Sequence, residues 1–249
     1  MFFPREIGLK RSPCLSREVF DNYVNKLNGK ANIYTSLFHY ERKHPTKAWK
    51  FDPESVVMDR AWWDFDMTED TTIADVKKDV HTLIDRLSGD VRVVATGRGF
   101  HVHELFQKPV KGTAISRHIV RYENQAAQGL KTLDGVGNPQ KLTRVPDTYN
   151  VTRGRWAVNV DVGAFMDNPL GCTIPDRPGV LLSEDPFRGR ESESDFNIVE
   201  WIANNPPKEI EQVTERFAGE IGTMNTVPLP PCLDKHIRHE NPKHDVRKA

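Results

Sequence analysis

The hexapeptide Trp62–Met67, with the sequence WWDFDM, constrains the fold more than any other segment of the 249-residue chain. Side chains alternate between the two faces of a β-strand, so Asp64 and Asp66 share one face with Trp62, and Phe65 lies on the other. The two aspartates therefore sit side by side, roughly 7 Å apart between their Cα atoms. Placing two carboxylates beside apolar side chains on one strand face is unfavourable in free energy unless a cation neutralises them.

Divalent magnesium or manganese fits this pair, because hard cations prefer oxygen ligands. Two such ions about 4 Å apart are a general device for in-line nucleotidyl transfer. An isolated Asp-x-Asp pair is more often a solvated strand face whose carboxylates meet water, lysine or arginine. The pair alone therefore predicts either a metal site or an ordinary polar surface.

The segments around the hexapeptide alternate between strand and helix patterns. Apolar residues at helical spacing predict a helix from about Thr72 to Leu87. The β-branched run Val91–Ala95 predicts a strand, which the turn Thr96–Gly99 connects to a further strand, Phe100–Phe106. This order predicts an α+β (mixed α/β) protein, in which helices pack on one face of a mixed sheet.

Further elements are expected on both sides of this region. A helix capped by Ser16 runs to Leu27, and a helix around Ala114–Gln128 precedes a glycine-rich loop, Leu133–Pro139. The remaining expected strands are Asn32–His39, Leu142–Val145 and Trp156–Asp161, and the expected closing helices are Asp195–Asn204 and Lys208–Gly222.

Composition and charge limit the class of protein. The chain carries 35 basic and 35 acidic residues, so its zero net charge does not mark it as a nucleic-acid-binding protein. No run approaches the roughly 18 apolar residues of a membrane-spanning helix, and the N-terminus lacks the apolar core of a secretory signal. Three widely spaced cysteines argue against a disulfide framework. We therefore expect a protein of the reducing cytoplasm, with no membrane partner.

A glycine turn follows the predicted helix and strand, in the sequence ATGRGFHVHELF. Gly97 and Gly99 flank Arg98, and a tight turn of this kind leaves backbone N–H groups free to approach phosphate oxygens. His101 lies just past the turn, beside Arg98, where it is placed to hold a triphosphate. The segment is not a Walker A loop, because it lacks the G-x-x-x-x-G-K-[ST] spacing. Taken alone, the turn is an ordinary hairpin, and His103 is a structural histidine.

In their order along the chain, these motifs resemble the archaeo-eukaryotic primase superfamily, in particular the small catalytic subunit of archaeal DNA primase. The shared order is an Asp-x-Asp strand, a helix, and then S/T-G-x-G-x-H opening a strand. Three more stretches resemble those subunits: PREIGL at Pro4–Leu9, IYTSLFHYE at Ile33–Glu41 and LTRVPDTYNVTRG at Leu142–Gly154. In the last stretch, Asp147 stands where those subunits normally have glycine. The match runs over roughly residues 4–160.

The resemblance implies a primase-polymerase catalytic core with an RRM-like sheet, and it implies roles for individual residues. Asp64, Asp66 and a third acid would hold two magnesium or manganese ions. Asp134 is the preferred third acid, and Asp161 is its rival. The residues that would bind the incoming nucleotide are Arg98, Gly99, His101 and Arg144, and those that would hold template phosphates are Lys141, Arg144, Arg153 and Arg155.

The activity implied by the resemblance is that of a DNA primase, a template-dependent nucleotidyltransferase of DNA replication that makes or extends RNA or DNA primers. Its substrates would be ribo- or deoxynucleoside triphosphates and its template single-stranded DNA. Its host would be archaeal, viral or plasmid-bearing, and a helicase or replisome would be a further partner. The alternatives are an end-joining or translesion polymerase of the same superfamily, a metal-dependent nuclease, and a non-catalytic RRM-like nucleic-acid-binding module.

The resemblance also implies a division into a catalytic domain at 1–222 and a tail at 223–249. Within the catalytic domain, an N-terminal αβ module covers about 1–60, the metal and nucleotide core about 61–165, and a closing helical segment about 190–222.

The tail, Leu229–Lys248, resembles the start of the iron–sulfur domain of primase large subunits, which would be present in cis in a longer chain or in trans. In that domain a Pro-Pro-Cys segment supplies one cluster ligand. The single Cys232 cannot hold a cluster that needs four thiolates, so a cluster would require a longer parent protein. A zinc site from Cys232, His236 and His239 and a solvated tail are the alternatives.

Overall fold

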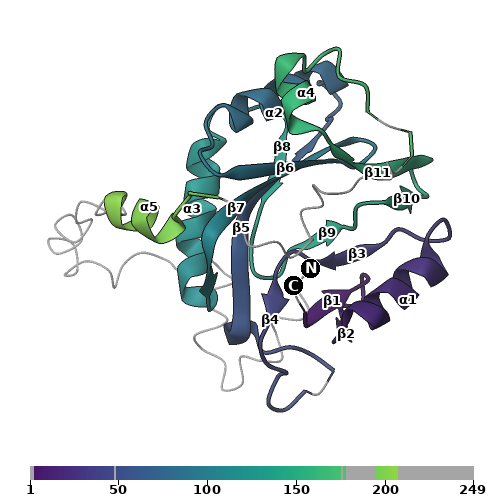
Figure 1. The fold of residues 1–249 in the computed structure, drawn as a ribbon, viewed down its shortest axis with the longest axis vertical. Helices are drawn as coiled ribbons and strands as arrows, with labels where there is room; N and C mark the ends of the chain where they lie inside the picture. The colour runs from purple at the N-terminus through teal and green to yellow at the C-terminus, as the bar shows by residue number, and fades with distance from the viewer. Residues whose placement is uncertain (1–2, 48, 175, 178–193, 207–249) are drawn as a thin grey trace, which may run out of the picture. The chain divides into compact units, whose positions relative to one another are not determined.

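The computed structural model describes most of the chain up to residue 206, in the ranges 3–47, 49–174, 176–177 and 194–206. Contacts between Cα atoms divide the chain into a unit of Met1–Asn204 and a second unit, Asn205–Ala249. The first unit is built from two β-sheets and five α-helices among its described residues (Figure 1). The predicted mixed α/β class is therefore confirmed.

The larger sheet has seven strands in the order β10-β11-β6-β7-β5-β4, with β8 also paired to β5. Its central strands are β6 (Asp90–Ala95), β7 (Gly99–Lys111) and β5 (Val56–Asp66). Its outer strands are β10 (Thr148–Asn150), β11 (Arg155–Val160), β4 (His39–Tyr40) and β8 (Leu133–Val136).

The strand–helix–strand segment predicted around the hexapeptide forms β5, α2 (Ile73–Ile84) and β6, and β7 lies between the two strands. Both β5 and β6 are antiparallel to β7, so they run parallel to each other without pairing. Every ladder among the described residues is antiparallel, whereas the sequence predicted a sheet of mixed direction. The inserted strand explains the difference, because it separates the parallel strands that a helical crossover produces.

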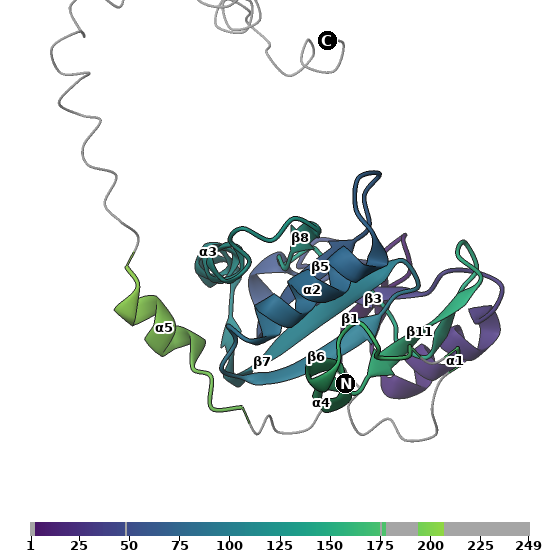
Figure 2. The same cartoon turned by 90° about the horizontal axis from the view of Figure 1, so that it is seen from above.

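Helices cover one face of this sheet, and α2 begins where its sequence indicates (Figure 2). The Thr72 hydroxyl accepts a hydrogen bond from the Asp75 N–H, and the Asp75 carboxylate accepts one from the Thr72 N–H, so the capping box is complete although Asp replaces Glu or Gln. The helices on this face are α2, α3 (Ser116–Ala126) and α4 (Val162–Asp167), which share one core with Trp63, Phe65 and Phe100.

The smaller sheet has the order β2-β1-β3-β9. Its strands are β2 (Ser12–Cys14), β1 (Arg5–Ile7), β3 (Tyr34–Ser36) and β9 (Leu142–Arg144). As predicted, Ser16 caps α1 (Arg17–Leu27), whose buried Phe20 packs against Ile7, Cys14, Ile33 and Val145. The predicted strand Asn32–His39 is divided between β3 and β4, because Leu37 and Phe38 are buried in the main core at the point where the chain passes from one sheet to the other.

Two further segments differ from the sequence prediction. The expected loop Leu133–Pro139 contains β8, whose backbone pairs with the free edge of β5 next to Asp64. The expected helix Asp195–Asn204 begins later, as α5 (Ile198–Asn204), because the preceding residues pack in extended form with Phe196 against Phe106 and Tyr122. Short 3-10 turns, η1 (Pro53–Ser55) and η2 (Thr113–Ile115), precede β5 and α3.

The predicted helix Lys208–Gly222 and the tail from 223 onward, with its cluster and zinc candidates, lie outside the described residues. Among the residues that are described, no helix combines the length and the apolar character needed to cross a bilayer.

Candidate active site

A cavity of about 330 Å³ lies where β5 and β7 of the larger sheet meet β3 and β9 of the smaller one. Its volume is in the range of small-molecule sites. The wall formed by the larger sheet carries the predicted carboxylates and histidine, and the opposite wall is largely basic and amide-bearing. The lining residues are Asn32, Tyr34, Asp64, Asp66, Thr96, Arg98, His101, Lys141, Leu142, Arg144, Asn150, Thr152 and Arg153.

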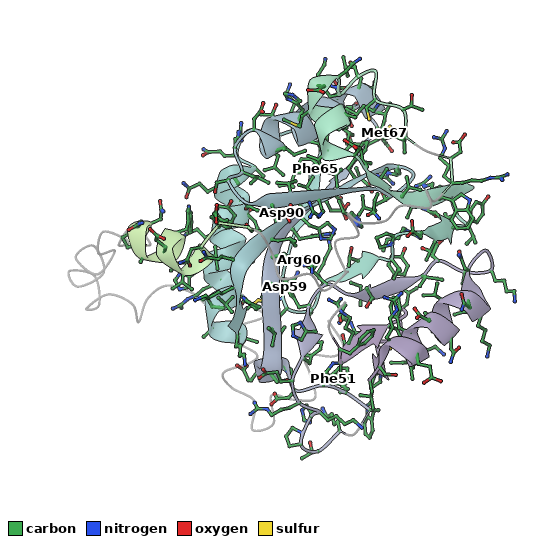
Figure 3. All side chains as sticks on the ribbon, in the orientation of Figure 1. Phe51, Asp59, Arg60, Phe65, Met67 and Asp90 are labelled. Atoms are coloured by element: carbon green, nitrogen blue, oxygen red, sulfur yellow. The ribbon has the colours of Figure 1, made fainter. Side chains whose placement is uncertain are left out.

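Asp64 and Asp66 share the cavity face of β5, as the alternation of the strand predicted. Asp64 lies opposite His101 in the ladder with β7, and Asp66 lies opposite Gly99. The Asp64 Oδ1 atom is 3.4 Å from His101 Nε2, and its Oδ2 atom is 3.9 Å from Lys141 Nζ. Figure 3 labels Phe65 and Met67, the neighbours of Asp66 at this end of β5.

The pKa values of the two aspartates are shifted in opposite directions. Burial alone would raise the pKa of Asp64, but the hydrogen bond and charge of His101, together with the charges of Lys141 and Arg98, hold it below its usual value. Burial and the neighbouring charge of Asp64 raise the pKa of Asp66, and Asp134 adds to this effect. The charge of Arg98 lowers the pKa of Asp66 but does not outweigh these two effects, so Asp66 is less fully compensated by cations than Asp64.

His101 is held from both sides. Its Nδ1 atom lies 3.1 Å from the Thr143 hydroxyl of β9, and its ring makes an edge contact with Trp62 at 4.9 Å between centroids. Only 7% of the residue is exposed. The ring is thus fixed with Nε2 toward Asp64 and the cavity.

The close packing of β7 against β5 requires a glycine at position 99 of the glycine turn. A Cβ atom at Gly99 would lie 1.7 Å from the Phe65 carbonyl oxygen, so β7 can approach β5 this closely only without a side chain there. Gly97 adopts φ +97°, which glycine tolerates. Between them, Arg98 donates hydrogen bonds to the Met67 carbonyl oxygen at 2.7 and 3.2 Å and lies 3.4 Å from Asp66. The turn therefore places a cation beside the less compensated carboxylate.

Arg144 supplies a second cation from the opposite wall. Its guanidinium lies over the Tyr34 ring at 4.8 Å and donates to the Tyr34 hydroxyl at 2.9 Å. Within the described part of the chain, its buried Nη1 atom has no hydrogen-bond partner, and the residue is only 7% exposed. Burial lowers the pKa of Arg144. A buried guanidinium with an unused donor is suited to an anionic ligand.

Asn150 is the second buried group at the cavity with an unused polar atom. Its amide donates to the Thr96 carbonyl at 3.0 Å, whereas its Oδ1 atom has no partner among the described residues. The turn before β10 is shaped by Asp147, which adopts the left-handed conformation with φ +63°. An aspartate thus takes the conformation that glycine would allow at this position.

The two candidates for the third acid lie in different surroundings. Asp134 is exposed on β8, at a register shift opposite Asp64 and Phe65, and its charge acts on Asp66. Asp161 caps α4, because its Oδ1 accepts a hydrogen bond from the Ala164 N–H at 2.8 Å. Neither lines the cavity. In the described ranges, no group of three His, Cys, Asp or Glu residues is placed to hold a metal ion.

The structure brings together most of the residues singled out in the sequence. Asp64, Asp66, Arg98, His101, Lys141, Arg144 and Arg153 all line the cavity. Gly99 and Arg155 instead line a separate hollow of about 80 Å³ on the far side of the glycine turn.

Sequence reasoning missed Thr143, which contacts His101, and several polar residues of the cavity wall. The signal for Tyr34 and Asn150 was present, since both lie in stretches that carry the family resemblance. The other missed lining residues with polar side chains are Asn32, Thr96 and Thr152.

The donor set at the end of β5 fits a hard divalent cation. Asp64 and Asp66 offer oxygen ligands from one strand face, and a cation would offset the burial and the repulsion from Asp64 that raise the pKa of Asp66. Asp134 is the further carboxylate near enough to act on Asp66.

The comparisons with known proteins give a likeness at the level of structure. No protein-family model and no curated protein matches the sequence. The structure is similar to the polymerase domain of ligase D from Mycobacterium tuberculosis, solved in complex with DNA. The identity is 14% and the TM-score 0.44, and the alignment covers 82% of this chain and 72% of that chain.

Proposed function

We propose that the chain is a template-dependent nucleotidyltransferase of the primase-polymerase type. The observation that carries the proposal is the single cavity in which a pair of strand carboxylates faces Arg98, His101 and Arg144. Nucleotidyl transfer needs both halves of this arrangement, because the metal ions require anionic ligands and the triphosphate requires cations. The motif resemblance over residues 4–160 supports the same assignment.

In this proposal the cationic residues position the substrate. Arg144, with its unused Nη1 donor, and Arg98 bind triphosphate oxygens, and His101 Nε2 contacts the same group. Thr143 keeps the His101 ring in place. Holding the triphosphate at fixed points orients its α-phosphorus for in-line attack. Lys141 and Arg153 bind template phosphates near the cavity.

Asp64 and Asp66 would hold magnesium or manganese, with Asp134 as the third acid. When bound, these ions would lower the pKa of the attacking 3′-hydroxyl and neutralise the departing pyrophosphate. The raised pKa of Asp66 indicates a carboxylate that is incompletely compensated by the protein's own cations.

The decisive test is nucleotide incorporation by the full chain on a primed single-stranded DNA template, with magnesium or manganese and with ribo- or deoxynucleotides. We expect Asp64→Ala to abolish incorporation while circular dichroism stays unchanged. The control is Asp167→Ala, which removes an exposed carboxylate at the end of α4 and should leave incorporation intact. Synthesis by Asp64→Ala at the wild-type rate would refute the proposal.

The finer assignment is a DNA primase that starts its own primers. Dinucleotide formation on a template without any primer tests it. Extension of a primer without such formation would indicate an end-joining or translesion polymerase instead.

A further inference from the structure

We propose that a hairpin outside the candidate active site, residues 41–47 and 49–52, binds single-stranded nucleic acid by stacking a base on Trp49. We call it the Trp49 hairpin. The inference deepens the proposed function, on which it rests for the identity of the bound strand, namely the template that leaves the candidate active site.

The Trp49 hairpin is an ordered extension between β4 and β5. Lys43 and Phe51 form an antiparallel bridge, the Asp52 N–H donates to the Arg42 carbonyl at 3.0 Å, and the His44 N–H donates to the Lys50 carbonyl at 2.9 Å. Figure 1 shows it projecting past the start of β5, and Figure 3 labels Phe51 there, at the opposite end of β5 from Met67.

The charges of the hairpin leave a surplus of cations. Its acids are neutralised, because Asp52 pairs with Arg42 at 2.9 Å and Glu41 pairs with Lys111 at 2.5 Å. Lys43, Lys47 and Lys50 are exposed, and none of them has an ion-pair partner among the described residues. In a chain of zero net charge, this local excess marks a site for a polyanion.

Trp49 adds an exposed aromatic ring to this surface, and binding by charge alone would not require such a ring. The residue is 66% exposed, although indole is among the most apolar side chains to leave in water. An exposed aromatic ring among lysines is the combination by which proteins bind unpaired bases and the phosphates between them.

A cavity of about 450 Å³ lies beside the ring. Lys10, Arg11 and Lys50 line it together with Trp49, and Tyr40 and Phe51, stacked at 5.1 Å, form its inner side. The one acid in the lining, Glu6, is paired with Arg11 at 2.6 Å. The cavity therefore offers cations and aromatic surface together.

This cavity adjoins the candidate active site. Gln140 lines the former and the next residue, Lys141, lines the latter. The segment between them is held in place, because Tyr40 donates to the Pro139 carbonyl at 3.1 Å and Arg11 donates to the Gln140 carbonyl. A strand that leaves the active site past Lys141 would thus meet Gln140 and the cavity beside Trp49. The continuity favours the template over an unrelated polyanion.

Binding of the full chain to a fluorescent oligothymidylate, followed by anisotropy at several salt concentrations, tests the proposal. A stacked base contributes enough that Trp49→Ala should weaken binding by about fivefold or more, whereas Trp49→Phe should bind nearly as wild type. The double variant K47A/K50A should lower the slope of log affinity against log salt by about 1.4, since each single-strand phosphate contact contributes about 0.7. The matched control is Lys78→Ala, which removes an exposed lysine on α2.

A blunt duplex of the same length is the second ligand, because its paired bases cannot stack on the indole. We expect Trp49→Ala to leave duplex binding unchanged. Equal weakening for duplex and single strand, or wild-type single-strand binding by Trp49→Ala, would overturn the proposal. This binding test is independent of the test of the proposed function. Asp64→Ala should bind the oligonucleotide with the affinity of the wild type. Weaker binding by Trp49→Ala would support the proposal even if the wild type incorporated no nucleotide.

Discussion

Asp64 and His101 lie directly opposite each other on β5 and β7, with Asp64 Oδ1 3.4 Å from His101 Nε2. They are 37 residues apart in the chain, and the antiparallel register brings them together. The Thr143 hydroxyl lies 3.1 Å from the other nitrogen of the same ring. A carboxylate, an imidazole and a hydroxyl from three strands thus form one chain of contacts at the base of the cavity.

Replacing Thr143 by valine should remove the contact between its hydroxyl and His101 without leaving a cavity in the core. Loss of one net hydrogen bond of about 1 kcal/mol predicts roughly a fivefold weaker binding of nucleoside triphosphate. Thr35→Val is the control, because Thr35 is the cross-strand neighbour of Thr143 and its hydroxyl donates to the Glu6 carbonyl. Both variants should lose similar stability, and only Thr143→Val should change nucleotide affinity and the ¹⁵N chemical shifts of His101.

Arg144→Gln should weaken triphosphate binding by about 10- to 100-fold, since hydrogen bonds to charged groups contribute about 1.5 to 3 kcal/mol. The affinity is measured by isothermal titration with a non-hydrolysable nucleotide. Arg155→Gln removes the same charge from an exposed residue outside the cavity and should bind normally. Equal affinities of the two variants would contradict a role of Arg144 in binding the triphosphate.

Manganese titration decides between the two candidates for the third acid. Asp134→Ala should lose manganese affinity, because its charge acts on Asp66. Asp161→Ala should keep that affinity and lose about 1 kcal/mol of stability, as expected for an N-cap. The opposite pattern of manganese affinities would assign the role to Asp161.

Gly99→Ala should destabilise the protein by about 1 to 3 kcal/mol, because its Cβ atom would lie 1.7 Å from the Phe65 carbonyl oxygen and force β7 away from β5. Urea denaturation measures the loss. Gly163→Ala, in α4, is the control, since its Cβ atom would come no nearer than 3.4 Å to another group. That variant should be as stable as the wild type or slightly more stable.

Glu123 predicts a pH dependence of stability. Its carboxyl is fully buried behind β5 and accepts the Trp62 N–H at 2.8 Å, and burial raises its pKa well above the usual value. A carboxyl with a raised folded-state pKa contributes stability below its unfolded-state pKa of about 4.3, and this contribution is lost as the pH rises through the folded-state value.

Glu123→Gln keeps an oxygen acceptor for Trp62 and cannot ionise. Its free energy of unfolding should therefore fall less than that of the wild type between pH 5 and pH 9, as urea denaturation at a series of pH values would show. Parallel pH profiles for the two proteins would contradict the assignment.

Local sequence patterns predicted the elements whose stabilising interactions are themselves local. The apolar stripe and the Thr72 capping box defined α2, and alternation along WWDFDM placed Asp64 and Asp66 on one face of β5. The patterns did not predict β8, because Leu133–Val136 becomes a strand only through the free edge of β5. They also did not predict the break after Ser36, which depends on where Leu37 and Phe38 are buried.

The sequence by itself determined which chemical groups are available and which share a strand face, since these follow from residue type and from the twofold period of a strand. Only the tertiary structure decided that Arg144 and Thr143 lie across from Asp64 and His101, that Arg155 lies outside the cavity, and that Trp49 adjoins the same surface. Those relationships depend on strand register and on the packing of one sheet against another, which are set by contacts between residues far apart in the chain.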